Sequence, residues 1–521
     1  MNSSTYATAL VLMFSLCLFT PSYSARILAS VPSASYSHQV VFRPIWRELA
    51  KRGHEIVLIT TDPMEDVENI RQIDMSFSYG IMKNRNYDLL VTKAKESPIA
   101  FFEQFLQIFI EISFEQLKHP EVQNLIHNKS EKFDLLMIES VLPIHLGFVE
   151  IFHAPVIGLS SFDVSNKFHE IMGNEAHPIL FPDTTVVPYF HPLTLKQRAI
   201  ILLHELIAAT YGKYTIEAEL ASQLRAIFGA ECRPLMGLFE EIDMLFMNSN
   251  PILHSVRALA PNTIQFGGGF HLENATKSLP EDLKTYLDNA ENGVIYFSLG
   301  SNVKSYMLND HLRQVLLETF SELPYRILWK FENEDLPNKP QNVWISKWFP
   351  QGDIFRHPNI KLFITQCGLQ SIEEAIMNHI PMVGIPFIAD QPANAKILEN
   401  KGLGLQLDYD LLTKKIFKEA IEEVIHNSKY KRNVINIAEL LGDVEMKGIE
   451  KVVWWTEYVI RNRGTKFFKN TSLQLPFYQY YLIDVILFIV SVVLGFVLII
   501  HKLISLFINL KCKNAKKNKD S

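Results

Sequence analysis

The chain has 521 residues, of which 48% are hydrophobic, and a formal net charge of −6 at pH 7. A chain of this length is long enough for two or three domains with large cores. The acidic balance gives no electrostatic case for nucleic-acid binding, and four cysteines are too few for a disulfide scaffold.

The N-terminus carries an apolar stretch, Ala9 to Phe19, that is too short to span a bilayer. Small and polar residues follow it as far as Ala25. This pattern predicts a secretory signal peptide over residues 1–24. The rest of the chain would then enter a compartment where Asn-x-Ser/Thr sequences are glycosylated, and three are present, at Asn128, Asn274 and Asn470.

The first half of the remaining chain opens with a β-α-β pattern. Strands are predicted at Arg26–Val31 and Glu55–Thr60, with a helix over residues 39–52 that ends at Gly53. Such a unit starts a parallel sheet. The turn after the first strand lacks G-x-G-x-x-G, which argues against a nicotinamide or flavin cofactor. His38 lies at the ligand-binding edge of that strand, although a lone histidine there is more often a surface or capping residue.

Two long apolar helices are predicted, at residues 101–119 and 195–214. Their simplest role is core packing, and the alternative is to line an acceptor pocket or to touch a membrane. Between them, a strand over residues 133–138 ends at Glu139. A further strand at residues 244–248 closes this half.

The second half repeats the alternation of strands and helices. Gly300-Ser301 follows its first strand, on the ligand-binding edge. Asp408-Tyr-Asp410 resembles a D-x-D metal motif, but it precedes a predicted helix over residues 411–424, so Asp410 is interpreted as a helix cap. No other cluster in the sequence suggests a metal site. The strands are predicted at residues 294–298, 326–329, 343–346, 360–365 and 381–386.

The segment from 342 to 391 carries the densest set of candidate site residues. A strand at 360–365, the small-residue turn Gln366-Cys367-Gly368 and a helix over residues 369–378 follow one another. The free N–H groups and dipole of a helix N-terminus attract a phosphate, and Gly368 lets the backbone approach it closely. Cys367 is interpreted as a packing residue in this turn.

Polar side chains surround this predicted anion site. Ser371 offers a hydroxyl donor, and Glu374 on the same face suits the two hydroxyls of a ribose. The pair Ser371-x-x-Glu374 is equally the pattern of a helix capping box. Asp390 and Gln391 end the next strand, where a carboxylate and an amide can hold sugar hydroxyls.

The C-terminal region predicts a membrane anchor. Residues 485–500 carry no charge, and the tyrosines at 480 and 481 suit a membrane interface, so a transmembrane helix is predicted over residues 480–502. The lysine-rich tail, residues 503–521, is then cytosolic by the positive-inside rule. Lys517 and Lys519 match a dilysine retrieval signal, although a basic tail is often only a stop-transfer flank. The predicted location is the endoplasmic reticulum membrane, single-pass type I, with lumenal catalytic domains.

Residues 363–391 resemble the signature of the UDP-glycosyltransferase (UDP-glucuronosyltransferase-like) family. The resemblance is to the animal, membrane-bound type and, within it, to the insect branch. Trp348 and Gln351 match the preceding family element that stacks on and holds uracil and ribose, whereas Trp348 alone could be a core residue. The resemblance places Gln366, where many members have His, and Ser301 on the donor phosphates. It makes His38 the catalytic base, with Glu139, in place of the usual Asp, orienting it.

The resemblance implies an α/β fold of the GT-B type: two facing Rossmann-like, doubly wound domains followed by a transmembrane helix. The acceptor domain would be residues 25–265, the linker 266–285 and the UDP-sugar domain 286–465. The implied reaction is inverting transfer of a hexose, most simply glucose, from a UDP-sugar to a hydroxyl of a small lipophilic acceptor, for detoxification or conjugation. The UDP-sugar is a co-substrate, no cofactor is expected, and a homo-oligomer stays open. The alternatives are a transferase acting on a membrane lipid and a non-catalytic, membrane-tethered relative that binds sugar nucleotides or lipids.

Overall fold

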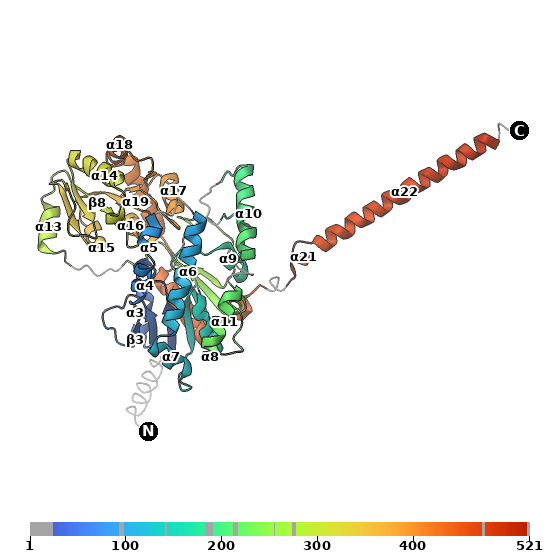
Figure 1. Cartoon of the computed structure of the whole chain (residues 1–521), viewed down its shortest axis with the longest axis horizontal. Coiled ribbons are helices and arrows are strands. Elements are labelled where there is room, and N and C mark those ends of the chain that lie inside the picture. Colours follow the sequence, from blue (N-terminus) through green and yellow to red (C-terminus); the bar gives the residue numbers. More distant parts are fainter. Residues whose placement is uncertain are drawn as a thin grey trace, which may run out of the picture. The chain divides into compact units, whose positions relative to one another are not determined.

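The computed structural model describes residues 24–92, 98–140, 143–182, 191–211, 217–254, 256–272, 278–470 and 475–517. The chain divides into two compact units, residues 1–468 and 469–521. Both sheets belong to the first unit, and the second consists mainly of one long helix (Figure 1). Residues 1–23 of the predicted signal peptide, the glycosylation sequence at Asn274 and Lys519 lie outside the described residues.

The N-terminal half of the first unit is built on a parallel sheet of seven strands in the order β3-β2-β1-β4-β5-β6-β7. The sequence predicted β1, β2, β4 and β6. It missed the polar edge strand β3, the short β5 with its internal glycine, and the three-residue β7. The strands are β1 (Arg26–Val31), β2 (Glu55–Thr60), β3 (Ile70–Asp74), β4 (Leu135–Glu139), β5 (Val156–Ser160), β6 (Ile242–Met247) and β7 (Thr263–Gln265).

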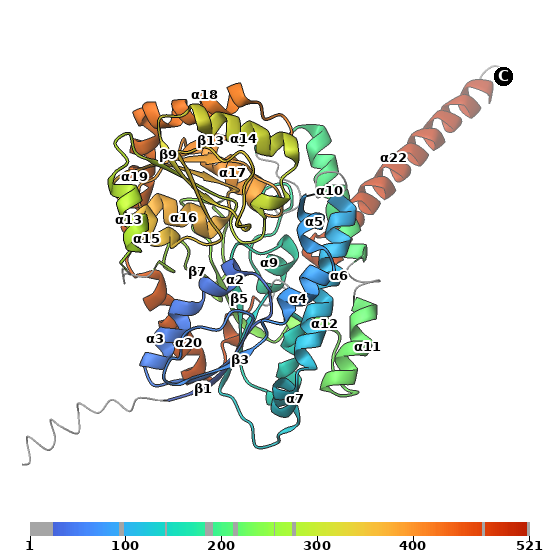
Figure 2. The same ribbon diagram turned by 60° about the vertical axis from the view of Figure 1, so that its left-hand side comes forward.

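The C-terminal half holds a second parallel sheet, in the order β10-β9-β8-β11-β12-β13. Five of its strands were predicted, and β13, only three residues long, was not. Figure 2 shows this sheet and its helices stacked on the first half of the unit. The strands are β8 (Val294–Ser298), β9 (Arg326–Lys330), β10 (Val343–Ser346), β11 (Ile360–Thr365), β12 (Met382–Gly384) and β13 (Gly404–Gln406).

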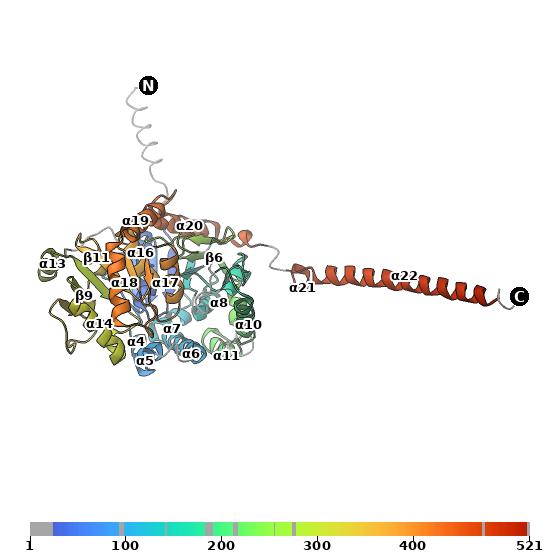
Figure 3. The same ribbon diagram turned by 90° about the horizontal axis from the view of Figure 1, so that it is seen from above.

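Helices cover both faces of the two sheets (Figures 2 and 3). In the N-terminal half they are α2 (Tyr36–Val40), α3 (Arg43–Lys51), α4 (Ser78–Asn84), α5 (Tyr87–Thr92), α6 (Pro98–Leu117), α7 (Pro120–His127), α8 (Val149–Phe152), α9 (Asn166–Met172), α10 (Leu195–Tyr211), α11 (Glu217–Phe228) and α12 (Leu235–Phe239). In the C-terminal half they are α13 (Glu281–Asp288), α14 (Asp310–Glu322), α15 (Gln351–Phe355), α16 (Leu369–Met377), α17 (Gln391–Asn400), α18 (Lys414–His426), α19 (Ser428–Gly442) and α20 (Gly448–Asn462).

The strand orders fix where ligands can bind. In each sheet the order reverses beside the first strand, between β1 and β4 and between β8 and β11. At such a switch point the connections leave on opposite sides and open a crevice at the carboxyl ends of the strands. Central strands such as β4 and β8 are buried along their whole length, as expected for parallel strands covered on both faces.

Two predicted helices differ from the structure. The helix expected over residues 39–52 is broken into α2 and α3 at Val41–Phe42, because Pro44 cannot donate a backbone hydrogen bond and suits the first turn of a new helix. Asp410 is not a helix cap: α18 begins later, and the hydroxyl of Thr413 accepts the Ile416 N–H at its N-terminus. Asp408 instead accepts the backbone N–H of Asp410.

The two long apolar helices have different environments. In α6 the side chains of Ile108, Phe109 and Ile112 are buried, so this helix is core. In α10 only Ile201 is recorded as fully buried among the described side chains, and the core interpretation of that helix is wrong.

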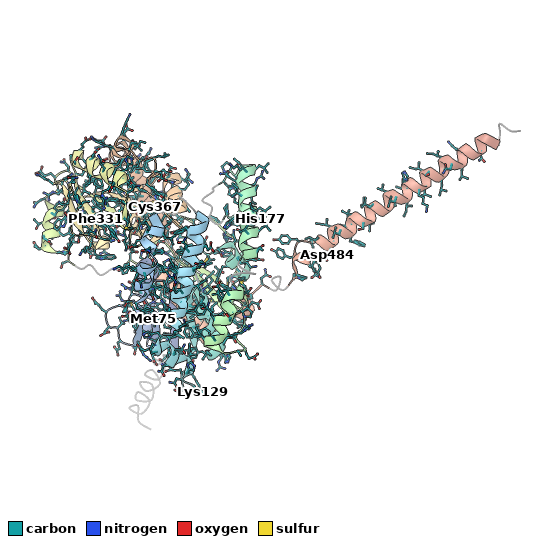
Figure 4. The ribbon with its side chains drawn as sticks, in the orientation of Figure 1. Met75, Lys129, His177, Phe331, Cys367 and Asp484 are labelled. Carbon is teal, nitrogen blue, oxygen red and sulfur yellow. The ribbon has the colours of Figure 1, made fainter. Side chains whose placement is uncertain are left out.

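Packing crosses between the two halves of the first unit. Helices α5 and α6 share a hydrophobic cluster with one face of the second sheet. Helix α20 returns to the first half, where Val452 and Val453 join the cluster around Trp46 of α3. The predicted domain boundary at residue 465 stays a prediction, but the helix that precedes it contributes to the core of the first sheet. In Figure 4, Met75 marks the first half and Cys367 the second.

The second unit contains α21 (Phe477–Tyr480) and α22 (Ile483–Lys517). The segment Ile483–Lys511 is long and apolar enough to cross a membrane, with a mean hydropathy of 3.1 in its most apolar window. This range overlaps the predicted transmembrane helix and extends it toward the C-terminus.

Replacing Val453 with Ala tests the role of α20. The side chain is fully buried, so removing two methyl groups should destabilise the first unit by about 2 kcal/mol. That loss lowers the thermal midpoint by roughly 2–4 °C per kcal/mol. The exposed Val444 is the matched control, because Val444→Ala removes no core contact. Equal midpoints for the two variants would contradict the packing of α20.

Candidate active site

A histidine and a buried carboxylate meet at the switch point of the first sheet. His38 lies in α2, just after β1, and Glu139 ends β4. The Nδ1 atom of His38 lies 2.6 Å from Oε1 of Glu139. The carboxylate is completely buried and the imidazole is 17% exposed. The alternative that His38 is only a surface or capping residue is therefore wrong, because the imidazole contacts a buried carboxylate.

The partners of this pair include residues that the sequence did not indicate. The second oxygen of Glu139 accepts the backbone N–H of Ser33, at 3.1 Å. The hydroxyl of Ser161 lies 3.1 Å from Nδ1 of His38, and the ring of Phe162 meets the imidazole edge to face. Ser161 and Phe162 follow β5, so recognising that strand would have pointed to them.

These contacts determine the tautomer of His38. An ionised carboxylate only accepts hydrogen bonds, so the proton shared with Glu139 belongs to Nδ1 of His38. Nε2 then keeps its lone pair and can accept a proton from a neighbouring group. The arrangement is that of a general base held by a carboxylate.

In the second half, three predicted donor residues lie together. The side-chain amide of Gln351, at the start of α15, donates to the hydroxyl of Ser371 at 3.1 Å and to Oε2 of Glu374 at 2.6 Å. Burial raises the pKa of Glu374 to about 7, while the hydrogen bond from Gln351 and the charge of Arg356 oppose that rise. The cluster thus joins α15 to one face of α16.

Trp348 is not a core residue, because its side chain is 55% exposed. Its ring meets Tyr36, from the N-terminal half, edge to face at 5.2 Å between centroids. The ammonium of Lys330, at the end of β9, lies 5.7 Å from the centre of the same ring. Lys330 was not singled out in the sequence, although its place at the carboxyl end of a strand is a usable signal.

The turn between β11 and α16 is tightly packed around Gln366. Gly300 has φ +72°, and a Cβ atom at that position would lie 2.0 Å from Nε2 of Gln366. Cys367 has φ +69°, a backbone conformation that costs a side-chain-bearing residue about 1–2 kcal/mol. Its thiol is fully buried, as the packing interpretation predicted.

The N-terminus of α16 has the form expected of an anion site. Gly368 is the N-cap residue and no side chain caps it, so Ser371 lies inside the first turn and the capping-box alternative is wrong. The backbone N–H of Leu369 acts to lower the pKa of the nearby Asp390 carboxyl group. Burial raises the pKa of that carboxyl group, whereas a hydrogen bond from Asn394 at 2.6 Å and the nearby His38 act against the rise.

Gln391 is less available than its sequence position suggests. The side chain is buried, and its carbonyl oxygen accepts the N–H groups of Phe387 and Ile388, at 2.9 and 3.1 Å. Only the amide nitrogen is left for a ligand.

The loop that carries Ser301 is held by two lysines. Lys304 donates to the carbonyl of Ser301 at 2.6 Å, and Lys330 donates to the carbonyl of Gly300 at 2.9 Å. Lys330 also pairs with Glu332 at 3.0 Å. Two ammonium groups therefore lie close to the predicted phosphate region, and each lowers the cost of bringing an anion there.

The two halves of the site face each other. Ser35 and Asn302, from the loops after β1 and β8, are joined by a hydrogen bond of 3.1 Å between their side chains. Gln370, in the first turn of α16, donates to the carbonyl of Ser161 at 2.8 Å. His38 is thus close enough to Asp390 for their charges to interact. Among the described residues no group of histidine, cysteine and carboxylate side chains could hold a metal ion.

The predicted glycosylation sequences that are described lie at the surface. Asn470 is exposed, and Asn128 is partly exposed with its side-chain oxygen accepting from the hydroxyl of Ser130 at 2.7 Å.

The fold of the chain is similar to that of solved glycosyltransferase structures. The crystal structure of Os79 from O. sativa in complex with U2F and trichothecene matches with a TM-score of 0.57 at 17% identity, over 83% of this chain and 100% of that one. The glycotransferase of kitacinnamycin matches with a TM-score of 0.55 at 16% identity, over 84% and 99%. With the two parallel sheets, these matches show that the fold is GT-B.

Sequence comparison gives the family. A model described as UDP-glucoronosyl and UDP-glucosyl transferase matches residues 26–519. UDP-glycosyltransferase UGT5 of the insect Dactylopius coccus is 31% identical, covering 92% of this chain and 91% of the relative. The ecdysteroid UDP-glucosyltransferase of Spodoptera littoralis nuclear polyhedrosis virus is 31% identical over 92% and 96%, and UDP-glucuronosyltransferase 2B1 of Rattus norvegicus 27% over 97% of each chain. The chain belongs to the UDP-glycosyltransferase family and is a UDP-glycosyltransferase enzyme.

Proposed function

We propose that this enzyme transfers glucose from UDP-glucose to a hydroxyl group of a small lipophilic acceptor, with inversion at the anomeric carbon, in detoxification or conjugation. The observation that carries the proposal is the short contact between His38 and Glu139, opposite the donor cluster of Gln351, Ser371 and Glu374. Several similar proteins are named UDP-glucosyltransferases, and some of these are named for ecdysteroids, which are steroids that carry hydroxyl groups. The UDP-sugar is the activated co-substrate, and the proposal uses no metal or cofactor.

The mechanism follows from the geometry of the two halves. Nε2 of His38 takes the proton of the acceptor hydroxyl as its oxygen attacks the anomeric carbon. Glu139 holds the imidazole and stabilises the imidazolium that forms. The bond to the β-phosphate oxygen breaks, and the charge that develops on UDP is met by Gln366, Ser301 and the α16 N-terminus.

The donor would lie between Trp348 and Asp390. Uracil stacks on Trp348, the ribose hydroxyls bind Glu374 with help from Gln351, and the phosphates approach Gly368 and Ser371. Asp390, electrostatically coupled to His38, then lies where the sugar joins the catalytic base. In this assignment Gln391 acts mainly by shaping the loop that precedes it, and only its amide nitrogen can contact the sugar.

The function is tested with labelled UDP-glucose, UDP-glucuronate and UDP-galactose across a panel of phenols, steroids and membrane lipids. We expect transfer from UDP-glucose to phenols or steroids, with a product of opposite anomeric configuration by nuclear magnetic resonance. Transfer only to bilayer lipids would favour the membrane-lipid alternative. Absence of transfer from any donor, with UDP bound, would favour the non-catalytic alternative.

We also propose that the enzyme is a single-pass type I protein of the endoplasmic reticulum, with α22 as its anchor and the catalytic unit in the lumen. Protease added to sealed microsomes should remove only a tail beyond about residue 502. The same protease should degrade the catalytic unit once detergent opens the vesicles. Degradation without detergent would contradict this orientation.

His38→Ala should lower turnover by roughly 10²–10⁴-fold, the usual contribution of a general base, and leave UDP affinity unchanged. Ser161→Ala is the matched control, because it alters the same Nδ1 environment without removing the base, and its loss should be much smaller. Steady-state rates and UDP titration measure both. Turnover of His38→Ala within a few-fold of the natural enzyme would contradict the assignment.

Substitutions of Gln366 and of Asp390 should have different effects on UDP affinity and on the rate of transfer. Gln366→Ala should weaken the binding of UDP by about 1–2 kcal/mol, the cost of one buried hydrogen bond left unmade. Asp390→Asn should leave the affinity for UDP unchanged and slow the transfer of the sugar, because a charge-assisted hydrogen bond to the sugar is lost. Isothermal titration with UDP, beside transfer rates, measures the two effects. If Asp390→Asn weakens UDP binding as much as Gln366→Ala does, the proposed placement of the UDP-sugar, from its base at Trp348 to its sugar at Asp390, is wrong.

UDP affinity should depend on pH through Glu374, whose pKa is raised to about 7. Below that value the carboxyl group is protonated, and above it the carboxylate accepts both ribose hydroxyls more strongly. Affinity should therefore rise between pH 6 and pH 8. The isosteric Glu374→Gln variant carries no titrating group, so its affinity should lack this component of the pH dependence. Identical pH profiles for the two proteins would exclude the ribose contact.

A further inference from the structure

The imidazole of His38 is oriented by the loop after β5 as well as by Glu139. The hydroxyl of Ser161 lies 3.1 Å from Nδ1, and the ring of Phe162 meets the imidazole edge to face, with 5.5 Å between centroids. Because the Nδ1 proton is donated to Glu139, the Ser161 oxygen can share it only as a second acceptor. Two consecutive residues of one loop thus help to set the direction in which Nε2 points.

Two side-chain amides hold the backbone of this loop. The carbonyl of Ser161 accepts from Nδ2 of Asn248 at 3.2 Å and from Nε2 of Gln370 at 2.8 Å. Asn248 follows β6 in the same half, whereas Gln370 lies in the first turn of α16, in the other half. Ser161 and Asn248 are completely buried. A carbonyl that is shielded from water depends on protein donors, so loss of the Gln370 amide would leave it with the longer bond to Asn248.

The start of α16 has partners in both halves of the unit. Ser371 and Glu374 belong to the donor cluster of the C-terminal half. Gln370 and Glu373 instead bond the N-terminal half, since Glu373 accepts from the same Asn248 amide at 3.4 Å. The amide of Gln370 is therefore engaged in a contact between the halves.

This contact joins the two reacting groups through a short path. The proposed phosphate site begins at Gly368, two residues before Gln370, and the loop held by Gln370 carries the contacts to His38. Transfer requires that Nε2, the acceptor oxygen and the anomeric carbon be aligned. A misplacement of about 1 Å, caused by a change far from the chemistry, can slow a reaction by about 10²-fold.

We propose that Gln370 is a positioning residue for sugar transfer. Its amide fixes the loop after β5, and the loop aligns the imidazole of His38 with the donor that is bound at the N-terminus of α16. The inference rests on the proposed function, because it uses His38 as the base and this helix terminus as the phosphate site. Gln370 touches neither the donor nor the acceptor in this role, so it acts on turnover and not on UDP affinity.

The first test uses Gln370→Met in the full chain, because methionine has a similar length and lacks the N–H donor. We expect kcat to fall about 10- to 100-fold, while isothermal titration shows an unchanged affinity for UDP. In a His38→Ala background the same change should cause no further loss, because it acts through the base. Gln314→Met is the matched control on α14, where the amide bonds the exposed Glu318, and it should alter neither quantity.

Hydrogen–deuterium exchange provides a second test that does not depend on turnover. UDP should slow exchange at the start of α16 in both the natural chain and Gln370→Met. It should slow exchange at residues 161–164 only in the natural chain, because the connection to the loop is missing in the variant.

Four outcomes would overturn the inference. Weaker UDP binding by Gln370→Met would make the residue a donor ligand, and unchanged turnover would exclude a positioning role. A loss that persists in the His38→Ala background would show that Gln370 does not act through the base. Equal protection of residues 161–164 by UDP in both proteins would show that the contact does not couple the halves. In contrast, absence of transfer by the natural chain would contradict the proposed function itself, and with it the inference.

Discussion

The N-terminal half of the site depends on one buried carboxylate. Glu139 is completely buried, and a charge in that position is tolerated only with hydrogen bonds to both of its oxygens. One oxygen takes the backbone N–H of Ser33 and the other takes Nδ1 of His38. The parallel pairing of β1 with β4 brings these groups together, because it aligns the carboxyl ends of two strands that are far apart in sequence. Fold and proton chemistry are thus coupled through a single side chain.

The extra methylene of Glu139, compared with the shorter aspartate expected from the family pattern, is accommodated in this arrangement. A short contact to His38 and a second bond to the loop after β1 are both made. The longer side chain therefore keeps the partnership while it spans the space between the two strand ends. Ser161, which directly follows a third strand, β5, completes the surroundings of the imidazole.

The sequence predicted the layout of the fold and most of the candidate site. Long apolar strands such as β8 and β11 were readable because burial on both faces gives continuous hydrophobic runs. Strands β7 and β13 were not, because three residues carry too little pattern and are fixed by pairing with a neighbour. Ser161 and Lys330 were missed for a related reason: each acts through tertiary contacts that no local spacing reveals.

The solvent exposure of apolar side chains was the property hardest to predict from the sequence. Helices α6 and α10 are similarly apolar, yet one is packed between the two halves of the unit and the other shows its leucines to solvent. Periodicity identifies an apolar face but not the surface that covers it. For Trp348 the sequence left a core position open beside the predicted uracil-stacking role, and the residue is exposed beside Tyr36.

Two adjacent glutamates on α16 connect the donor cluster to the linker between the halves. Glu374 bonds Gln351, whereas the fully buried Glu373 accepts the backbone N–H of Gly268 at 2.8 Å. Burial raises the pKa of Glu373 to about 7, and buried His271 lies 3.4 Å from it. A rigid helix that holds both contacts cannot shift toward a bound nucleotide without moving the linker as well. Binding of the donor nucleotide and the relative position of the two halves are therefore linked through two consecutive residues of one helix.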